Sequence, residues 1–247
     1  MMRSLKPSAR RVVTALAVLA LSACASAPEV ASANNPKDPF ETVNRRVSNF
    51  NDSLDVNLLT PVAKGYQAVT PNLVQTGVRN VFNNISDMWS TVNNGLQLKG
   101  RDTAESFMRV VVNTVFGVYG IFDVATPINL ERHPEDFGQT LGYWGVPNGP
   151  YLVLPLLGPS TLRDTAGLPL DYYADPVGRA SDVSIRNSAY ALRVTQKRTD
   201  LLKTSNLLEE ASLDKYSFTR DAYLQYRRSQ IYDGNPPDDL DDTSDPK

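Results

Sequence analysis

A segment rich in glycine and proline, residues 137–164, most constrains what this 247-residue chain can fold into. It reads FGQTLGYWGVPNGPYLVLPLLGPSTLRD and holds five glycines and four prolines. Glycine costs backbone entropy in a helix, and proline removes a donor and clashes with the preceding turn, so we expect no helix here. Trp144, Tyr151 and five nearby aliphatic residues make the segment too apolar for a solvated linker. We therefore predict an irregular segment that lies against protein or lipid at the centre of a helical protein.

The first 23 residues have the pattern of a secretory signal peptide. Four basic residues precede an apolar run over residues 12–21, and the small residues Ser22 and Ala23 follow it. Cys24, the only cysteine, completes the bacterial lipobox Leu-Ser-Ala-Cys. We predict cleavage before Cys24 and its modification with a diacylglycerol and an N-acyl chain, with no other cofactor. The alternatives are an ordinary signal peptide in which Cys24 is incidental, or a buried free thiol.

Cleavage at this point would leave 224 residues, with 21 basic and 27 acidic side chains and a net charge of −6. An acidic chain without a basic block argues against nucleic acid as a partner. The mature sequence has no run of 18 apolar residues, so we expect no spanning helix. We predict a flexible tether over residues 24–37, one domain over 38–234 and a disordered acidic tail over 235–247. Ala25, where an aspartate would favour inner-membrane retention, fits transport to the outer membrane.

Apolar residues at helical spacing predict a mainly helical, all-α protein. The expected helices cover about 38–54, 61–69, 74–96, 102–122, 183–202 and 215–232. Asp38 should cap the first helix, with Pro39 at its first position, and Asp102 with Glu105 resembles a capping box for the fourth. Residues 165–176 should be irregular, and no stretch alternates long enough to predict strands.

Two of these helices raise the question of what surrounds them. The helix over 74–96 has an apolar stripe, and its other face is rich in asparagine and poor in charge. It is either packed on two sides or lies at a lipid interface. The helix over 102–122 is apolar nearly all round, which predicts a buried central helix.

Arg198 is an anomaly, because it falls within the apolar arc of the helix over 183–202. Three alternatives are open: a side chain that snorkels, a buried ion pair, or the lining of a wet cavity. Asp164 and Asp171 are available partners for an ion pair.

The sequence offers little for catalysis. His133 is the only histidine, and no G-x-S-x-G turn supplies a serine nucleophile. One histidine with a lipidated cysteine does not make a usual zinc site, and no nucleotide-binding fingerprint occurs. We therefore predict neither an enzyme nor a metal protein.

The run FG-x-TLG-x-x-GV-x-x-GPY-x-x-LP-x-x-G-x-x-TLRD resembles the MlaA/VacJ family of outer-membrane lipoproteins. The similarity continues in Asp38-Pro39-Phe40-Glu41, Asn44-Arg45, Asn49-Phe50-Asn51, Phe107-x-Arg109-x-x-x-Asn113-Thr114-x-x-Gly117-x-x-Gly120-x-x-Asp123-x-Ala125 and Arg220-x-Ala222-Tyr223. It covers nearly the whole mature chain.

The resemblance implies a helical ring or disc in the inner leaflet of the outer membrane, lipid-anchored on the periplasmic side. Such a protein has an amphipathic channel, associates with trimeric porins, and passes mislocalised phospholipids to a periplasmic carrier of the MlaC type. By resemblance, Gly142, Gly145 and Gly149 would let a loop beside the channel flex. Asp164, Asp171 and Arg198 would line its wet side, and Asn49 with Phe50 would help hold its normal state. Simple turn-making by the glycines is the alternative for each.

Three functions remain open at this point. The first is phospholipid transport that maintains outer-membrane lipid asymmetry. The second is a structural, porin-associated lipoprotein that moves no lipid. The third, a phospholipid-cleaving enzyme, would need His133 or a carboxylate.

Overall fold

The computed structural model describes residues 35–211 and 214–237. The chain divides into two units, Met1–Asn35 and Pro36–Lys247, and the following account concerns the second. The signal peptide, Cys24 and most of the acidic tail lie outside the described residues, so the predictions made for them stay predictions.

Helices dominate the described part of the chain, which confirms the mainly helical class. The elements are α2 (Glu41–Leu54), a π-helical turn (Asp55–Leu59), α3 (Thr60–Val69), α4 (Asn72–Leu96), α5 (Gly100–Val115), a 3₁₀ turn (Thr126–Ile128), α6 (Phe137–Tyr143), β1 (Tyr151–Leu154), β2 (Gly158–Thr161), α7 (Leu162–Ala174), a 3₁₀ turn (Pro176–Arg179), α8 (Val183–Ala211) and α9 (Lys215–Ile231).

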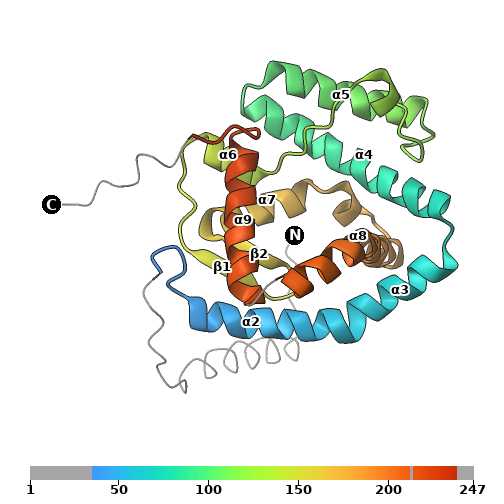
Figure 1. Ribbon diagram of the computed structural model, residues 1–247. Coiled ribbons are helices and arrows are strands. Elements are labelled where there is room, and N and C mark those ends of the chain that lie inside the picture. Colours follow the sequence, from blue (N-terminus) through green and yellow to red (C-terminus); the bar gives the residue numbers. More distant parts are fainter. Residues whose placement is uncertain (1–34, 212–213, 238–247) are drawn as a thin grey trace, which may run out of the picture. The chain divides into compact units, whose positions relative to one another are not determined.

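Contacts between these elements form a closed circuit (Figure 1). Helix α2 leads through α3 to α8, and α8 contacts α4, which pairs with α5 as a long antiparallel hairpin. Helix α4 also contacts α6, and α6 packs on α7 and α9. The circuit ends where α9 contacts β2 and β1 returns to α2.

The α4–α5 hairpin is inverted relative to a water-soluble protein. Its buried residues are mainly polar: Asn93 and Asn94 of α4 are 0% exposed, and Arg109 of α5 is 3% exposed. Its apolar side chains point outward, and Val115 and Phe116 are 66% and 71% exposed. The prediction of a buried central helix over 102–122 is therefore wrong. The apolar residues recur at the predicted helical spacing, but the stripe that they form lies on the outer face of the helix.

Both predicted helix caps are also wrong. Helix α2 begins after Phe40, and the carboxylate of Asp38 is buried instead. It accepts hydrogen bonds from Asn44 Nδ2 at 2.8 Å, the Tyr216 hydroxyl at 2.5 Å and Arg220 Nη1 at 3.3 Å. These donors, one of them cationic, stabilise the carboxylate more than a helix N-terminus would. Glu105 likewise binds His133 Nε2, at 2.7 Å, and caps no helix.

The glycine- and proline-rich segment is far more regular than its composition predicts. It contains α6, an antiparallel hairpin in which Tyr151 pairs with Thr161, and the start of α7. Asp136 caps α6 through a 2.9 Å bond from Gln139 N, and Thr161 caps α7 through a 3.1 Å bond from Asp164 N. Helix α7 continues through Pro169, so the prediction of irregular structure over 165–176 is wrong as well.

A small apolar core lies where the hairpin meets α2 and α9. Tyr151, Val153 and Tyr216 are buried there, and the rings of Tyr151 and Tyr216 meet edge to face at 6.2 Å. This core fixes the hairpin against α2, near the start of the described chain, and α9, near its end.

Candidate functional site

Two asparagines of α2 hold the hairpin as an extra strand would. Asn44 Nδ2 donates to the Tyr151 carbonyl, and Asn44 Oδ1 accepts from Val153 N, both at 2.9 Å. Asn51 repeats the pattern with the Leu154 carbonyl at 2.9 Å and Leu156 N at 2.8 Å. Residues seven apart lie on one face of a helix, so both amides face the same edge of β1.

The clamped hairpin borders an amphipathic cavity of about 400 Å³. Helices α2, α8 and α9 provide the other walls. Apolar side chains on the wall include Leu156, Leu157, Leu201 and Phe218, and charged ones include Asp55, Arg198 and Lys215. A molecule with an apolar body and a charged head matches this mixture of side chains.

Arg198 combines two of the three alternatives that its position left open. It lines this cavity, and it forms a bidentate ion pair with Asp55, with Nε–Oδ1 and Nη2–Oδ2 distances of 2.6 and 2.7 Å. Asp55 lies in the π-helical turn that continues α2. The expected partners Asp164 and Asp171 are wrong, because both lie in other clusters.

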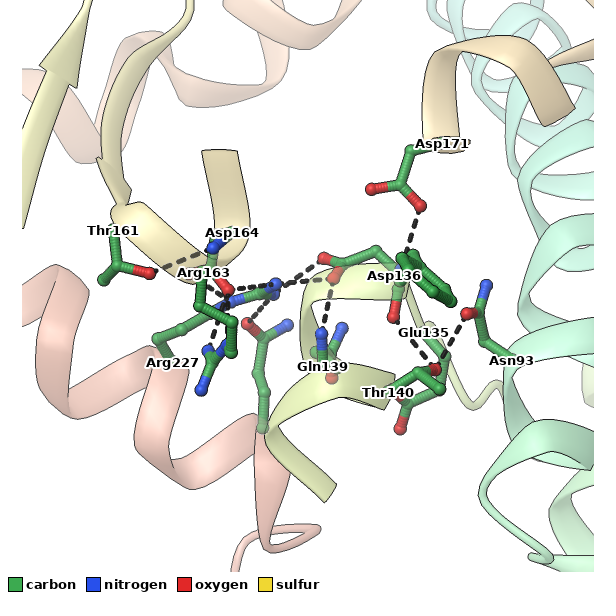
Figure 2. Close-up of polar contacts among 12 residues, drawn as sticks. Asn93, Glu135, Asp136, Gln139, Thr140, Thr161, Arg163, Asp164, Asp171 and Arg227 are labelled. Atoms are coloured by element: carbon green, nitrogen blue, oxygen red, sulfur yellow. Dashed lines mark hydrogen bonds and ion pairs between the residues drawn. The ribbon is translucent and has the colours of Figure 1, made fainter. Parts of the chain in front are cut away.

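Asp164 belongs to a buried network that joins α6, α7 and α9 (Figure 2). Its Oδ1 accepts from Arg163 Nη2 at 2.7 Å, and its Oδ2 accepts from Arg227 Nε at 3.0 Å and from the Tyr223 hydroxyl at 2.9 Å. Arg227 also binds Asp136 through Nη1, at 2.7 Å from Oδ2. Burial raises the pKa of Asp164, but hydrogen bonds and charge from the two arginines outweigh it and the net pKa is lowered. Two carboxylates thus face two guanidinium groups.

Asp171 has a different environment. Its Oδ1 accepts from Trp89 Nε1 at 2.7 Å and from Phe137 N at 2.8 Å, which ties α7 to α4 and α6. Burial is the largest influence, and it raises the pKa of Asp171 above the ordinary value.

A second ionic cluster fills the α4–α5 hairpin. Arg109 Nε lies 3.4 Å from Asp87 Oδ2, Arg109 Nη2 lies 3.2 Å from Asp123, and Nη1 donates to the Leu130 carbonyl at 2.6 Å. Arg132 Nε lies 2.7 Å from the other oxygen of Asp87. Arg109, Asn113 and Asp123 were predicted only as part of the motif over residues 107–125, with no role assigned to them, so this cluster was missed.

A family model described as MlaA lipoprotein matches residues 36–230. The chain belongs to the MlaA lipoprotein family. A relative from Haemophilus influenzae, named intermembrane phospholipid transport system lipoprotein MlaA, is 30% identical over 230 residues, 91% of this chain and 92% of that protein. The Escherichia coli K12 protein of the same name is 35% identical over 76% of each chain.

A solved structure agrees with the MlaA assignment. It comes from work on the structural basis for maintenance of bacterial outer membrane lipid asymmetry, and it superposes with a TM-score of 0.69 at 32% identity. The match covers 80% of this chain and 99% of the solved one.

The structure distributes the residues that the MlaA resemblance singled out over several places. Asn49 and Phe50 lie on α2, beside the asparagines that clamp the hairpin, and Phe50 is exposed. Gly145 and Gly149 have φ values of +88° and +65°, which favour glycine. Gly142 instead lies within α6, where a Cβ would meet Arg163 Nη1 at 2.8 Å. Its role here is close packing, so the flexible-loop role does not fit Gly142.

Residues 35–211 and 214–237 contain few groups that could take part in catalysis or metal binding. No group of three or more His, Cys, Asp or Glu side chains there is placed to hold a metal ion. Among the same residues, no helix combines the length and apolar character needed to cross a membrane. His133 lies against Glu105 and near Asp102, with Nδ1–Oδ1 at 3.8 Å.

Proposed function

We propose that this protein is an outer-membrane lipoprotein that removes mislocalised phospholipids from the outer leaflet and passes them to a periplasmic carrier. In this proposal the acyl chains on Cys24 anchor it on the periplasmic side, in a Gram-negative cell envelope. A carrier of the MlaC type and trimeric porins are the proposed protein partners. The names of its MlaA relatives support the transport class.

The inverted α4–α5 hairpin is the observation that carries the proposal. Water-exposed helices bury their apolar stripe, whereas this hairpin exposes Met88, Phe107 and Val115 and buries its polar side chains. Apolar area costs about 25 cal/mol per Å² when it faces water, so lipid is the favoured surrounding for such a face. A hairpin with one apolar side suits immersion from one face of a membrane.

In this proposal, the cavity beside the β-hairpin is the path of the lipid. A phospholipid needs cationic groups near its phosphate and apolar walls along its chains. Arg198 and Lys215 are the cationic groups, each paired with an aspartate of the same wall, Asp55 and Asp52. Leu201 and Phe218 form part of the apolar wall. The pairing of Arg198 with Asp55 holds the guanidinium in place on the wall.

The test is the amount of phospholipid exposed at the surface of intact cells. An amine-reactive reagent that does not cross the outer membrane reports phosphatidylethanolamine in the outer leaflet. We expect labelling to rise when the gene is deleted, to return to normal with the wild-type copy, and to stay high with Cys24→Ala.

A pair of variants on α9 tests the cavity. Phe218 lines it, whereas Tyr226 is an exposed aromatic residue on the same helix and is not among the lining residues. Phe218→Asp should fail to restore asymmetry, while Tyr226→Asp, expressed at the same level, should restore it. Unchanged labelling on deletion, together with damaged porin assembly, would replace transport by the structural role.

A further inference from the structure

A second cavity, of about 260 Å³, lies between the end of α6, the loop over residues 145–148 and the end of α9. It shares no lining residue with the 400 Å³ cavity. Arg163 and Arg228 line it, and its wall contains no aspartate or glutamate. Asp164 pairs with Arg163 but does not line the cavity, so both charged side chains on the wall are cationic.

Arg163 is the decisive side chain, because it is only 2% exposed and yet incompletely bonded. Its Nε and Nη2 both donate to the same oxygen, Asp164 Oδ1, at 3.1 and 2.7 Å. Within the described part of the chain, Nη1 has no hydrogen-bond partner. An N–H group that faces a cavity without a protein acceptor can donate to a bound ligand or to water.

Gly142 lets Nη1 lie close to the backbone of α6. A Cβ at position 142 would lie 2.8 Å from Arg163 Nη1 and 2.9 Å from Ile231 Cδ1, so any side chain there would displace the guanidinium. At Gly145, which also lines the cavity, a Cβ would meet nothing within 4 Å. The open part of the cavity thus lies beside Gly145, on the same wall as the buried Arg163 side chain.

The remaining donors lie close by. Asn148 lines the cavity, and its buried Oδ1 has no partner among the described residues, so no protein hydrogen bond to this oxygen fixes the orientation of the amide. It can turn its NH₂ group toward an anion. Arg228 binds the Pro237 carbonyl through Nη2 at 2.6 Å and adds positive charge to the wall.

We propose that this cavity binds a phosphate-type anion, with Arg163 Nη1 as the principal donor and the Asn148 amide as a further donor. A planar guanidinium matches phosphate oxygens better than an ammonium does. The phosphate could belong to a free anion or to a phospholipid headgroup. In the second case the inference rests on the proposed lipid transport and adds a headgroup site apart from the main cavity.

The binding experiment uses the full acylated protein in detergent and two probes. One is inorganic phosphate at constant ionic strength, and the other is short-chain phosphatidylglycerol below its micelle concentration, with titration calorimetry as the readout. Saturable binding of both probes would mean that the site recognises phosphate alone. Binding of the lipid only would assign a headgroup site. Binding of phosphate only would assign a free anion. Absence of saturable binding by both would overturn the proposal.

Three variants localise the binding. Arg163→Lys keeps the charge but loses the planar pair of donors, Gly142→Ala displaces the Arg163 guanidinium, and Asn148→Leu removes the amide from the opposite wall. Each should weaken binding at least tenfold, whereas Arg46→Gln, at an arginine of α2 away from this cavity, should change it less than twofold. Asn148→Leu leaves the Arg163–Asp164 pair in place, so it reports even if the two other variants fail to fold.

The binding result for these variants can be interpreted independently of the phospholipid-labelling test of transport. If the three variants bind as well as Arg46→Gln, the anion site is wrong whatever the lipid labelling shows. If they lose binding while the Phe218→Asp and deletion strains show normal labelling, the site stands and the transport proposal falls.

Discussion

Replacing Asn44 by alanine should destabilise the protein far more than the same change at Asn51. Both amides bind the edge of β1, but they differ in burial. Asn44 serves Tyr151 and Val153, which are 1% and 8% exposed. Alanine there leaves a buried carbonyl and a buried N–H without partners. At about 1–3 kcal/mol for each unsatisfied group, the loss is about 2–6 kcal/mol.

The change at Asn51 has a smaller cost because water can replace the amide. Its bond to Leu156 N is exposed and its bond to the Leu154 carbonyl is half-buried. We expect a loss of about 1 kcal/mol, the net value of an ordinary hydrogen bond. The two substitutions remove the same atoms from the same face of α2, but Asn44→Ala also removes the bond to buried Asp38, which adds to its cost.

The assay is equilibrium unfolding by urea in detergent, followed by far-ultraviolet circular dichroism, with the slope of the transition compared between variants. A gap in unfolding free energy of at least about 2 kcal/mol between Asn44→Ala and Asn51→Ala supports the clamp. Equal losses at the two positions would refute the reasoning, because they would show that burial of the β1 edge does not set the cost.

Three further predictions concern charge and surface. Arg109→Met should cost about 3–5 kcal/mol in urea unfolding, because it leaves buried Asp87 with one cation fewer, whereas exposed Arg101→Gln should cost under about 0.5 kcal/mol. Burial raises the pKa of Asp171, so the contribution of Asp171 to stability should fall as pH rises above the ordinary carboxyl pKa of about 4. Asp171→Asn should remove this part of the pH slope and be the more stable form at neutral pH, and an unchanged slope would contradict it. Val115→Glu should leave unfolding in detergent nearly unchanged but reduce flotation with liposomes, and full flotation would count against lipid contact by α5.

Helix positions could be predicted from the sequence because the apolar period is a local property. The helices expected over 61–69 and 215–232 are α3 (Thr60–Val69) and α9 (Lys215–Ile231). The spacing of the apolar residues does not indicate which face of a helix meets solvent. For α4 the lipid interface was one of two alternatives, and for α5 the assumption of an aqueous surrounding gave the wrong side.

The errors in residues 137–174 have another cause. Rules based on composition assign the same helix-breaking effect to every glycine and proline. The actual effect depends on where each residue lies in the structure. Gly142 is tolerated in α6 because Arg163 and Ile231 need the space, and Asp136 offsets part of the cost by capping the helix. The ion-pair partner of Arg198 was predicted wrongly for a comparable reason. Its partner Asp55 lies 143 residues away in a π-helical turn that no local pattern indicates.

The inverted hairpin also explains why its buried face is rich in asparagine and poor in charge. Asn93 Nδ2 donates to the Trp89 carbonyl at 3.0 Å, Asn94 Nδ2 to the Ser90 carbonyl at 2.9 Å, and Thr91 Oγ1 to the Asp87 carbonyl at 2.8 Å. Each donor uses the carbonyl one turn back on the same helix, so α4 satisfies much of its own polar face without water. A charged side chain has no such local partner and must find a counter-ion, as Asp87 does in Arg109 and Arg132. Uncharged polar residues are therefore favoured wherever a helix must turn its polar face inward and its apolar face to lipid.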